Sequence, residues 1–355
     1  MKVTIKDVAE LAGVSFKTVS RVVNQEGGVK AEMREKVQSA IEQLNYQPNL
    51  SARRLRGKSA TIGFIYNNPN SNYVITMLHG ILAAARANAY ELVVHPCETE
   101  SDPGAIVEEI VALTRRSMVA GLVLTPPISE NPDILAKLDA VEIPYSRIVS
   151  SSSPPADVAR TIYIDDRQAA YQITKHLLAQ KHKRICFLNG DPEHMSSGER
   201  LEGYKQALRE HQVPLDDTLV LEGHYTFESG MERAQQVLSR APAPTAIFAC
   251  NDEIAAGALF AARMQGVRVP EQLAIAGFED SPFSRQTWPS LTTAKQPMDE
   301  IAQHATEILI RLVGGEDGDD VDYSDHGYLP EIIVRESSTY VHKESSTYVH
   351  KESST

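Results

Sequence analysis

Hydrophobic positions follow two different periods along the chain. In the first 48 residues, apolar side chains recur every three or four positions, which is typical of short amphipathic helices. From residue 61 onward, short continuous apolar runs alternate with amphipathic stretches, which is typical of buried parallel strands connected by helices. The pattern predicts an α/β fold class, in which an all-α N-terminal domain precedes a larger core of parallel sheets.

The N-terminal region predicts three helices around a small core. Residues 5–12 have one apolar face, a turn follows at Gly13, and Ser15 can cap a second helix over residues 16–24. A third helix is expected over 31–44, with these apolar residues buried: Met33, Val37, Ile41 and Leu44. The second helix presents Lys, Ser, Arg and Asn outward, and the arrangement predicts a helix-turn-helix.

The larger region predicts two lobes. Two series of buried strands begin at TIGFIY (61–66) and TIYID (161–165), and together they are too many for one open sheet. The stretch SSSSPPAD, residues 150–157, separates the two series, and we interpret it as the crossing between the lobes. Neither GxGxxG after the first strand nor GxxxxGK[ST] occurs, which argues against dinucleotide and P-loop sites.

Charge is distributed unevenly. Residues 1–60 contain 11 Lys and Arg against 6 Asp and Glu, whereas the remainder contains 24 against 41. A basic module joined to an acidic one indicates that a polyanion is contacted through the N-terminal end. The three scattered cysteines lack metal-ligand spacing, so we expect no metal, no cofactor and a reducing compartment. With no apolar signal segment and no run of membrane-spanning length, we expect a cytoplasmic protein without a membrane partner.

Several motifs resemble those of the lactose-repressor (LacI) family. Two N-terminal stretches resemble the family's DNA-binding head and hinge: IKDVAELAGVSFKTVSRVVN and REKVQSAIEQLNYQPNLSARRLRGKSATIG. Four later stretches resemble the family's core: GERLEGY (198–204), FACNDEIAAGAL (248–259), AGFEDSPFS (276–284) and LTTAKQP (291–297). The resemblance covers nearly the whole chain to Thr339. It implies a ligand-controlled transcription factor, usually a repressor, that acts as a homodimer.

The resemblance also implies a domain organisation. We expect a helix-turn-helix domain at 1–48, a hinge helix and linker at 49–60, a two-lobed periplasmic-binding-protein-like core at 61–339 with lobe boundaries near 150–160 and 285–325, and a disordered tail at 340–355. The tail is a tandem repeat of a polar eight-residue unit, too short to form a core.

Three positions depart from the family pattern. Lys30 stands where relatives commonly have Ser or Thr as a helix cap, which costs about 1 kcal/mol of capping free energy. Glu279 replaces the usual Asp, and Arg147 lies in a region where many relatives place an aspartate. The last two departures concern the identity of the ligand.

The resemblance assigns two DNA-contacting segments. In the second helix, Phe16, Lys17 and Arg21 are expected to contact base edges; the remaining residues would orient the helix on phosphates: Ser15, Thr18, Ser20 and Asn24. For Phe16 the alternative is an exposed aromatic that closes the small core.

The hinge would fold when two copies pair on DNA, since so short a helix is unstable alone. Asn49 would cap it, Ala52 would permit close approach, and Leu55 would enter the minor groove as a wedge. Arg53, Arg54 and Arg56 would contact phosphates or the minor groove. The alternative is a solvated basic linker.

The core motifs assign a ligand site between the lobes. Arg200 can contact adjacent hydroxyls or a carboxylate, and Asn251 and Glu279 each follow a strand, where open α/β sheets bind ligands. Tyr225 and Tyr73 could stack on a sugar ring. Further candidates are His194, Ser196, Arg147 and Gln296. The alternative for Arg200 and Asn251 is a hydrogen bond or salt bridge within one lobe. Asp252 is expected to cap the helix after Asn251 and not to touch the ligand.

These residues suit an uncharged, polyhydroxylated molecule. We expect a repressor of carbohydrate-utilisation genes that binds a pseudo-palindromic operator in double-stranded DNA as a homodimer or tetramer and responds to a sugar or sugar derivative. A nucleobase or nucleoside effector remains an alternative. No nucleophile or acid–base pair stands out at a plausible spacing, which argues against an enzyme. A transport-type sugar-binding protein would lack the helix-turn-helix.

Overall fold

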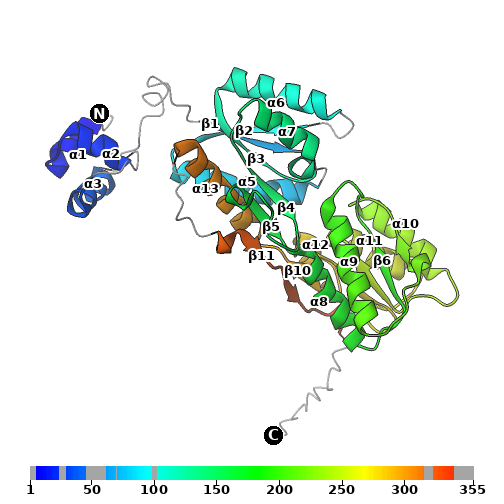
Figure 1. Cartoon of the computed structure of the whole chain (residues 1–355). Helices are drawn as coiled ribbons and strands as arrows, with labels where there is room; N and C mark the ends of the chain where they lie inside the picture. The colour runs from blue at the N-terminus through cyan, green and yellow to red at the C-terminus, as the bar shows by residue number, and fades with distance from the viewer. Residues whose placement is uncertain are drawn as a thin grey trace, which may run out of the picture. The chain divides into compact units, whose positions relative to one another are not determined.

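A computed structural model describes residues 5–23, 29–44, 61–68, 70–97, 102–315 and 323–339 of the 355-residue chain. Contacts divide the chain into a helical N-terminal unit and an α/β unit that begins at Thr61 (Figure 1). We call these the head and the core. Several hinge and DNA-contact candidates lie outside the described residues: Asn24, Asn49, Ala52, Arg53, Arg54, Leu55 and Arg56.

The head consists of three helices, α1 (Ile5–Ala12), α2 (Phe16–Val23) and α3 (Ala31–Leu44). Gly13 makes the turn between α1 and α2 with φ +65°, a value that glycine adopts without strain. The Ser15 Oγ accepts a hydrogen bond from the Thr18 backbone N–H at 3.1 Å and so caps α2. A small apolar cluster joins the helices: Val8, Ala9, Val19, Val22, Val37 and Ala40. The predicted helix-turn-helix is confirmed.

One core expectation in the head is wrong. Met33 is 43% exposed, whereas Val37 is fully buried and Ile41 and Leu44 pack against the cluster. The cluster centres on Val37 and Ala40. Met33 lies one turn earlier, near the beginning of α3, and stays outside it.

The N-terminal lobe of the core is a sheet with the strand order β11-β5-β4-β3-β1-β2. Its strands are β1 (Thr61–Tyr66), β2 (Glu91–Pro96), β3 (Val119–Leu124), β4 (Tyr145–Ser150), β5 (Thr161–Ile164) and β11 (Gly327–Tyr328). Its helices are α5 (Ser71–Ala87), α6 (Pro103–Ser117), α7 (Pro132–Ala140), α13 (Met298–Gly314) and the 3₁₀ turns η1 (Ile128–Glu130), η2 (Val158–Arg160) and η4 (Ser324–His326). Apolar side chains of α13 pack on β3, β4 and β5.

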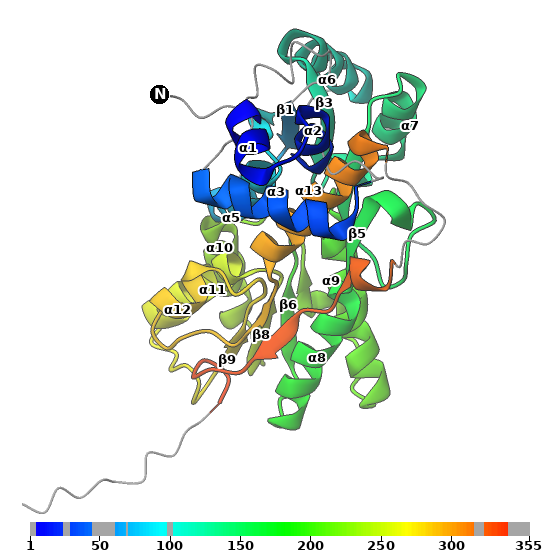
Figure 2. The ribbon, with the colours of Figure 1, turned by 90° about the vertical axis from the view of Figure 1, so that its left-hand side faces the viewer.

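The C-terminal lobe is a parallel sheet with the order β7-β6-β8-β9. Its strands are β6 (Ile185–Leu188), β7 (Val220–Leu221), β8 (Ala246–Ala249) and β9 (Ala274–Ala276), with the antiparallel pair β10 (Thr293–Lys295) and β12 (Glu331–Ile333). Its helices are α8 (Asp166–Ala179), α9 (Met195–Glu210), α10 (Phe227–Leu238), α11 (Asp252–Met264), α12 (Pro282–Gln286) and the turn η3 (Asp217–Leu219). Figure 2 shows α10 and α11 on one side of this sheet and α8 and α9 on the other. The expected two-lobed fold is confirmed.

The chain crosses between the lobes three times. The crossings follow β5, precede α13 and connect β11 to β12. The interpretation of residues 150–157 as a crossing is wrong, because they connect β4 to β5, two adjacent strands of one sheet. The first crossing comes at Asp165. The second falls within the expected 285–325 boundary, and the third lies just beyond it.

Close packing of helices in the C-terminal lobe depends on glycine. A Cβ at Gly203 of α9 would lie 2.1 Å from the backbone oxygen of Arg167 on α8. No room exists for a methyl group at that distance, so the two helix backbones would have to separate.

We therefore expect Gly203→Ala to lower the free energy of unfolding by about 1–3 kcal/mol or more, the cost of overpacking a core. Gly198 lies on the same helix with open space around it, so Gly198→Ala is the matched control. It should be neutral or add about 0.5–1 kcal/mol through helix propensity. Urea unfolding of the two variants measures the difference. Equal stabilities would show that the α8–α9 contact tolerates a side chain.

Candidate functional site

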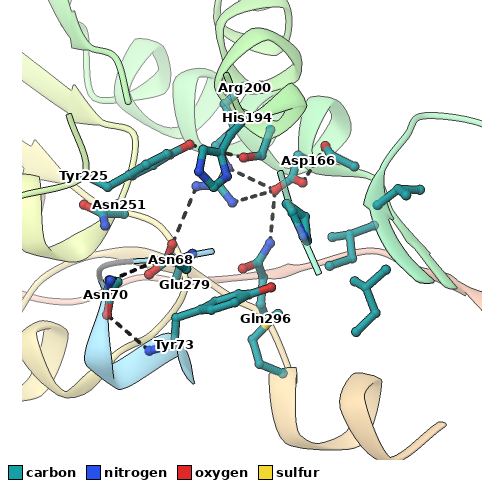
Figure 3. A pocket seen from close by; sticks show the side chains of 17 residues that line it. Asn68, Asn70, Tyr73, Asp166, His194, Arg200, Tyr225, Asn251, Glu279 and Gln296 are labelled. Carbon is teal, nitrogen blue, oxygen red and sulfur yellow. Dashed lines mark hydrogen bonds and ion pairs between the residues drawn. The ribbon is translucent and has the colours of Figure 1, made fainter. Parts of the chain in front are cut away.

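A pocket lies between the two lobes, at the carboxyl ends of the sheet strands (Figure 3). This is the position at which open α/β sheets bind ligands. The pocket is lined by Asn68, Asn70, Tyr73, Pro126, Ile148, Val149, Ser150, Ile164, Asp166, His194, Ser196, Arg200, Tyr225, Asn251, Glu279, Gln296 and Met298.

A buried ion pair forms the base of the pocket. The Asp166 Oδ1 accepts hydrogen bonds from Arg200 Nε at 3.0 Å and Gln296 Nε2 at 3.0 Å, and its Oδ2 accepts one from Ser150 Oγ at 2.6 Å. Arg200 Nη1 donates to the backbone oxygen of Cys250 at 2.6 Å. The Arg200 guanidinium also lies 3.9 Å from the centre of the Phe278 ring. Both charges are thus satisfied by the protein, which fixes the Arg200 side chain in place.

Asn251 and Glu279 lie beside this pair. The Asn251 Oδ1 accepts a hydrogen bond from Ile254 N at 2.9 Å and caps α11, whereas its buried Nδ2 has no hydrogen-bond partner among the described residues. Glu279 has φ +101°, a strained conformation for a residue with a side chain. Its backbone N–H donates to Ala294 O at 2.8 Å, which holds this geometry. A free donor and a constrained carboxyl therefore face one pocket.

Burial controls the charge of Glu279. Loss of hydration raises the pKa of its carboxyl to about 8, although Arg200 Nη1, 3.9 Å from Oε1, lowers it. Burial also lowers the pKa of His194, so the imidazole is neutral near pH 7. Since Asp166 compensates Arg200, the pocket suits an uncharged ligand.

Aromatic side chains form two walls. The Tyr225 ring covers Gly190, where a Cβ would lie 2.2 Å from the ring carbon Cζ. The Tyr225 hydroxyl bonds to Ser197 Oγ at 2.8 Å, and the His194 ring packs on Tyr225 edge to face at 5.5 Å. Tyr73 projects from α5 of the other lobe (Figure 3). Its helix is capped by Asn70, whose Oδ1 accepts a hydrogen bond from Tyr73 N at 3.1 Å.

Glu130 connects the lobes beside the pocket. Its Oε1 accepts a hydrogen bond from Ser150 N at 2.9 Å within the N-terminal lobe. Its Oε2 accepts one from Met195 N at 3.0 Å, at the beginning of helix α9 in the C-terminal lobe. Burial raises the pKa of this carboxyl to about 7, although the two N–H donors lower it. Because α9 also carries Arg200, Glu130 links the ligand-facing helix to the opposite lobe.

Eight of the nine expected ligand residues line the pocket: Tyr73, His194, Ser196, Arg200, Tyr225, Asn251, Glu279 and Gln296. Arg147 does not. Its guanidinium donates to Asp157 Oδ1 at 2.6 Å and to Ser129 O at 2.9 Å, so this expectation is wrong. The pocket begins at the next residues of β4, toward the strand end. Asp252 does not line the pocket, as expected, but the expectation that it caps α11 is wrong. Asn251 caps that helix, and Asp252 accepts hydrogen bonds from Ser281 N and Thr293 Oγ1.

Sequence reasoning missed Asn68, Asn70, Asp166 and Glu130. Asn68 and Asn70 follow β1, and Asp166 follows β5. The strand-end rule that selected Asn251 and Glu279 would have found these three. Glu130 has no such signal, since its bond to Met195 joins residues 65 positions apart.

The expected DNA-contacting residues of the head lie on or beside α2. Lys17 and Ser15 are exposed, and Phe16 is 42% exposed, so it does not close the core. Thr18, Ser20 and Arg21 are half-buried. The exposed residues form one end of α2, as a helix that enters a DNA groove requires.

Comparison with known proteins supports both parts of this architecture. Residues 4–49 match the family model described as bacterial regulatory proteins, lacI family, and residues 174–338 match a periplasmic binding protein-like domain. The HTH-type transcriptional repressor PurR of Haemophilus influenzae (strain PittEE) is 33% identical over 338 residues, covering 94% of this chain and 98% of PurR. The HTH-type transcriptional regulator DegA of Bacillus subtilis (strain 168) is 34% identical, covering 85% and 88%.

Solved structures of two regulators are similar to this fold over nearly the whole chain. The lac repressor dimer bound to operator and the anti-inducer ONPF is similar with a TM-score of 0.70 and 29% identity, over 96% of this chain and all of that chain. The complex of the transcriptional regulator CelR with cellobiose has a TM-score of 0.69 and 28% identity, over 95% of this chain and all of that chain.

A DNA-binding head joined to a two-lobed binding core defines a ligand-responsive transcriptional regulator, not an enzyme. The chain belongs to the LacI family of bacterial regulatory proteins. Within the described part of the chain, no helix combines the length and apolar character needed to cross a membrane.

The raised pKa of Glu130 predicts a pH dependence. A carboxyl whose pKa is higher in the folded core contributes stability below its ordinary pKa of 4.5. That stability is lost as the pH rises through about 7. We expect Glu130→Gln, which cannot ionise, to flatten the fall in unfolding free energy between pH 5 and 7.5. Urea unfolding across this range measures the slope.

Glu193→Gln is the control, because Glu193 is exposed in the loop before α9. Asp252 and Glu279 have pKa values raised to about 7 and 8, so part of the slope should remain in the Glu130 variant. An unchanged slope in Glu130→Gln would show that this carboxyl stays hydrated.

Proposed function

We propose that the protein is a repressor whose operator affinity is changed by an uncharged saccharide bound between the lobes. The observation that carries the proposal is the composition of the pocket: compensated charges, aromatic walls and an unpaired amide donor. Saccharide hydroxyls both donate and accept hydrogen bonds, and the C–H faces of a sugar ring pack on aromatic rings. The cellobiose complex of CelR supports this class of effector.

The proposed ligand touches both lobes. Asn251 and Glu279 would hold it from the C-terminal lobe, and Tyr73 would contact it from the N-terminal lobe. A ligand can shift DNA affinity only if it binds two lobe arrangements unequally. Residues on both sides of the pocket supply that difference, because their separation depends on the arrangement.

A nucleobase or nucleoside is the second candidate. Tyr73 and Tyr225 lie on opposite lobes, and an aromatic base could pack against either ring. The Asn251 amide and the Glu279 carboxyl could meet donors and acceptors on its edge. The same binding experiment distinguishes the two effector classes.

We further propose that the protein binds a pseudo-palindromic operator as a homodimer. Large apolar side chains are exposed on the C-terminal lobe: Trp288 is 75% exposed and Met264 66% exposed. Their segments are joined by a hydrogen bond, since Arg263, the residue before Met264, donates from Nη2 to Trp288 O at 3.0 Å. Exposed apolar groups of this size are typical of an interface, and the lac repressor relative binds operator as a dimer. Residues 49–60 would serve as the hinge, with Asn49 as cap, Leu55 as wedge and Arg53, Arg54 and Arg56 on the DNA backbone.

Calorimetry tests the effector. The full chain is titrated with cellobiose, a panel of mono- and disaccharides, and a panel of nucleobases and nucleosides. We expect a saccharide to bind and Glu279→Gln to weaken it about 2- to 10-fold, the loss typical of a hydrogen bond between uncharged groups, because the pKa of this carboxyl is raised to about 8. Arg200→Ala is unsuitable, because it would leave Asp166 buried without its counter-charge.

Glu193→Gln controls for the loss of one carboxylate and should bind normally. The same saccharide should change operator affinity in a mobility-shift assay. Binding only by a nucleobase or nucleoside would select the second candidate, and saccharide affinity unaffected by Glu279→Gln would place the ligand elsewhere.

Lys17 tests the mode of DNA binding. We expect Lys17→Ala to relax sequence preference at one position per half-site, worth about 1–3 kcal/mol, because its amine would contact a base edge. Lys36→Ala removes the same charge from α3, where Lys36 pairs with Glu32, and should leave the preference intact. Fluorescence anisotropy on operators with single base-pair changes measures both. A uniform loss across all operators in Lys17→Ala would assign Lys17 to a phosphate instead.

A further inference from the structure

A cluster of histidines lies in the N-terminal lobe, apart from the ligand pocket. His326, at the end of η4, is fully buried. Its Nδ1 lies 2.9 Å from Val158 O and 3.2 Å from Thr161 O. Carbonyl oxygens only accept, so Nδ1 carries the proton and donates. With the Nδ1 proton held by these carbonyls, Nε2 is the ring nitrogen left to bind another group, and among the described residues this buried atom has no hydrogen-bond partner.

An unpaired buried acceptor is costly, and native proteins rarely keep one without a role. The ring of His304, from helix α13, lies next to the ring of His326. The two rings are nearly perpendicular, with centres 5.1 Å apart. His304 Nδ1 bonds to the Tyr328 hydroxyl at 3.1 Å, so its Nε2 is the nitrogen available toward His326 and Asp325.

Asp325 completes the cluster. Its Oδ2 lies 3.7 Å from His304 Nε2 and its Oδ1 lies 3.9 Å from His326 Nε2. Two ligand atoms that each lie about 2.1 Å from a tetrahedral zinc ion are about 3.4 Å apart. These two separations exceed that value by a few tenths of an ångström, and the ligand atoms of all three residues lie within 4.8 Å of one another. Asp325 is 70% exposed, which leaves a path from solvent.

We propose that His304, Asp325 and His326 bind a divalent transition-metal ion of the zinc class. Two imidazoles and one carboxylate suit zinc, nickel or copper, whereas magnesium and calcium prefer oxygen ligands alone. Val158 O and Tyr328 Oη hold the outer ring nitrogens, an arrangement that orients histidine ligands in metal sites. Water would occupy the remaining position.

The location gives the ion a structural consequence. His304 belongs to α13, which packs on the N-terminal sheet, and His326 directly precedes β11. After β11 the chain crosses to β12 in the C-terminal lobe. A bound ion would therefore fix the N-terminal end of the third connection between the lobes and stabilise the core.

Calorimetry of the tag-free full chain, freed of metal with a chelator, tests the site with zinc chloride. We expect one Zn²⁺ per chain and a higher melting temperature in zinc. Asp325→Asn should weaken zinc binding at least about tenfold, and Tyr328→Phe about 10- to 100-fold, as expected for loss of a ligand and of its hydrogen-bonded support. Without metal, Asp325→Asn should melt like the wild type, because Asp325 is exposed. Tyr328→Phe should melt lower, because it leaves His304 Nδ1 without its hydrogen bond, so its zinc affinity is measured well below its melting temperature.

Two other histidine groups need controls. His95, Cys97 and Glu109 also lie within ligand distance of one another, and Glu109→Gln should leave zinc binding unchanged. His342 and His350 belong to the C-terminal repeat, and a double His→Gln variant should likewise bind normally. Cobalt in the site should show no thiolate charge-transfer absorption. A thiolate band, loss of binding in either control, equal binding by Asp325→Asn, or no binding by the wild type would each overturn the proposal.

Discussion

The core depends on one buried ion pair, between Asp166 and Arg200. The side chains are only 2% and 4% exposed, and burying two charges is costly unless their remaining hydrogen-bonding atoms are satisfied. The hydrogen-bond partners of this ion pair come from three different elements. Ser150 belongs to the N-terminal lobe, Gln296 to the second crossing, and the Cys250 carbonyl follows β8. The pair therefore requires both lobes and one crossing to be in register. Its energetic demand explains why so many polar residues converge at this point.

The buried ion pair also limits which ligands the pocket can bind. Arg200 and Asp166 already satisfy one another, so a charged ligand would disturb a balanced arrangement instead of completing one. The Asn251 Nδ2 atom has no hydrogen-bond partner in the part of the chain that the structure describes, and the Glu279 carboxyl, with its pKa raised to about 8, can exist protonated near neutral pH. A protonated carboxyl both donates and accepts. The groups left to recognise a ligand therefore match hydroxyls and amides, and Pro126, Ile148 and Ile164 add apolar surface to the pocket lining.

Local sequence signals predicted much of this structure, and long-range geometry accounts for the failures. The Ser15 cap and the strand at Thr61–Tyr66 each follow from a few neighbouring residues. The expectation for Arg147 is wrong because a position near a strand end does not show where the side chain points. The side chain turns toward Asp157 and Thr161, which the following strand brings close to it. The lobe crossing was misplaced for a related reason. A Ser- and Pro-rich stretch marks a loop, but only strand pairing shows that β5 returns to the same sheet.

Apolar contacts inside the lobes and polar contacts between them determine how the two lobes can move relative to one another. Each lobe interior is a continuous apolar cluster, built on residues such as Phe187 and Phe248 in one lobe and Ile110 and Leu122 in the other. Two contacts across the cleft are instead hydrogen bonds: Glu130 Oε2 accepts one from the Met195 N–H, and the Ser150 hydroxyl donates one to Asp166. Apolar cores resist deformation because packing is lost with any displacement. Hydrogen bonds across a cleft can exchange with water at a net cost of about 1 kcal/mol each, or about 1.5–3 kcal/mol where one partner is charged. The lobes can therefore move as rigid bodies, and a ligand that contacts both lobes needs only a few kcal/mol of differential binding free energy to select one arrangement.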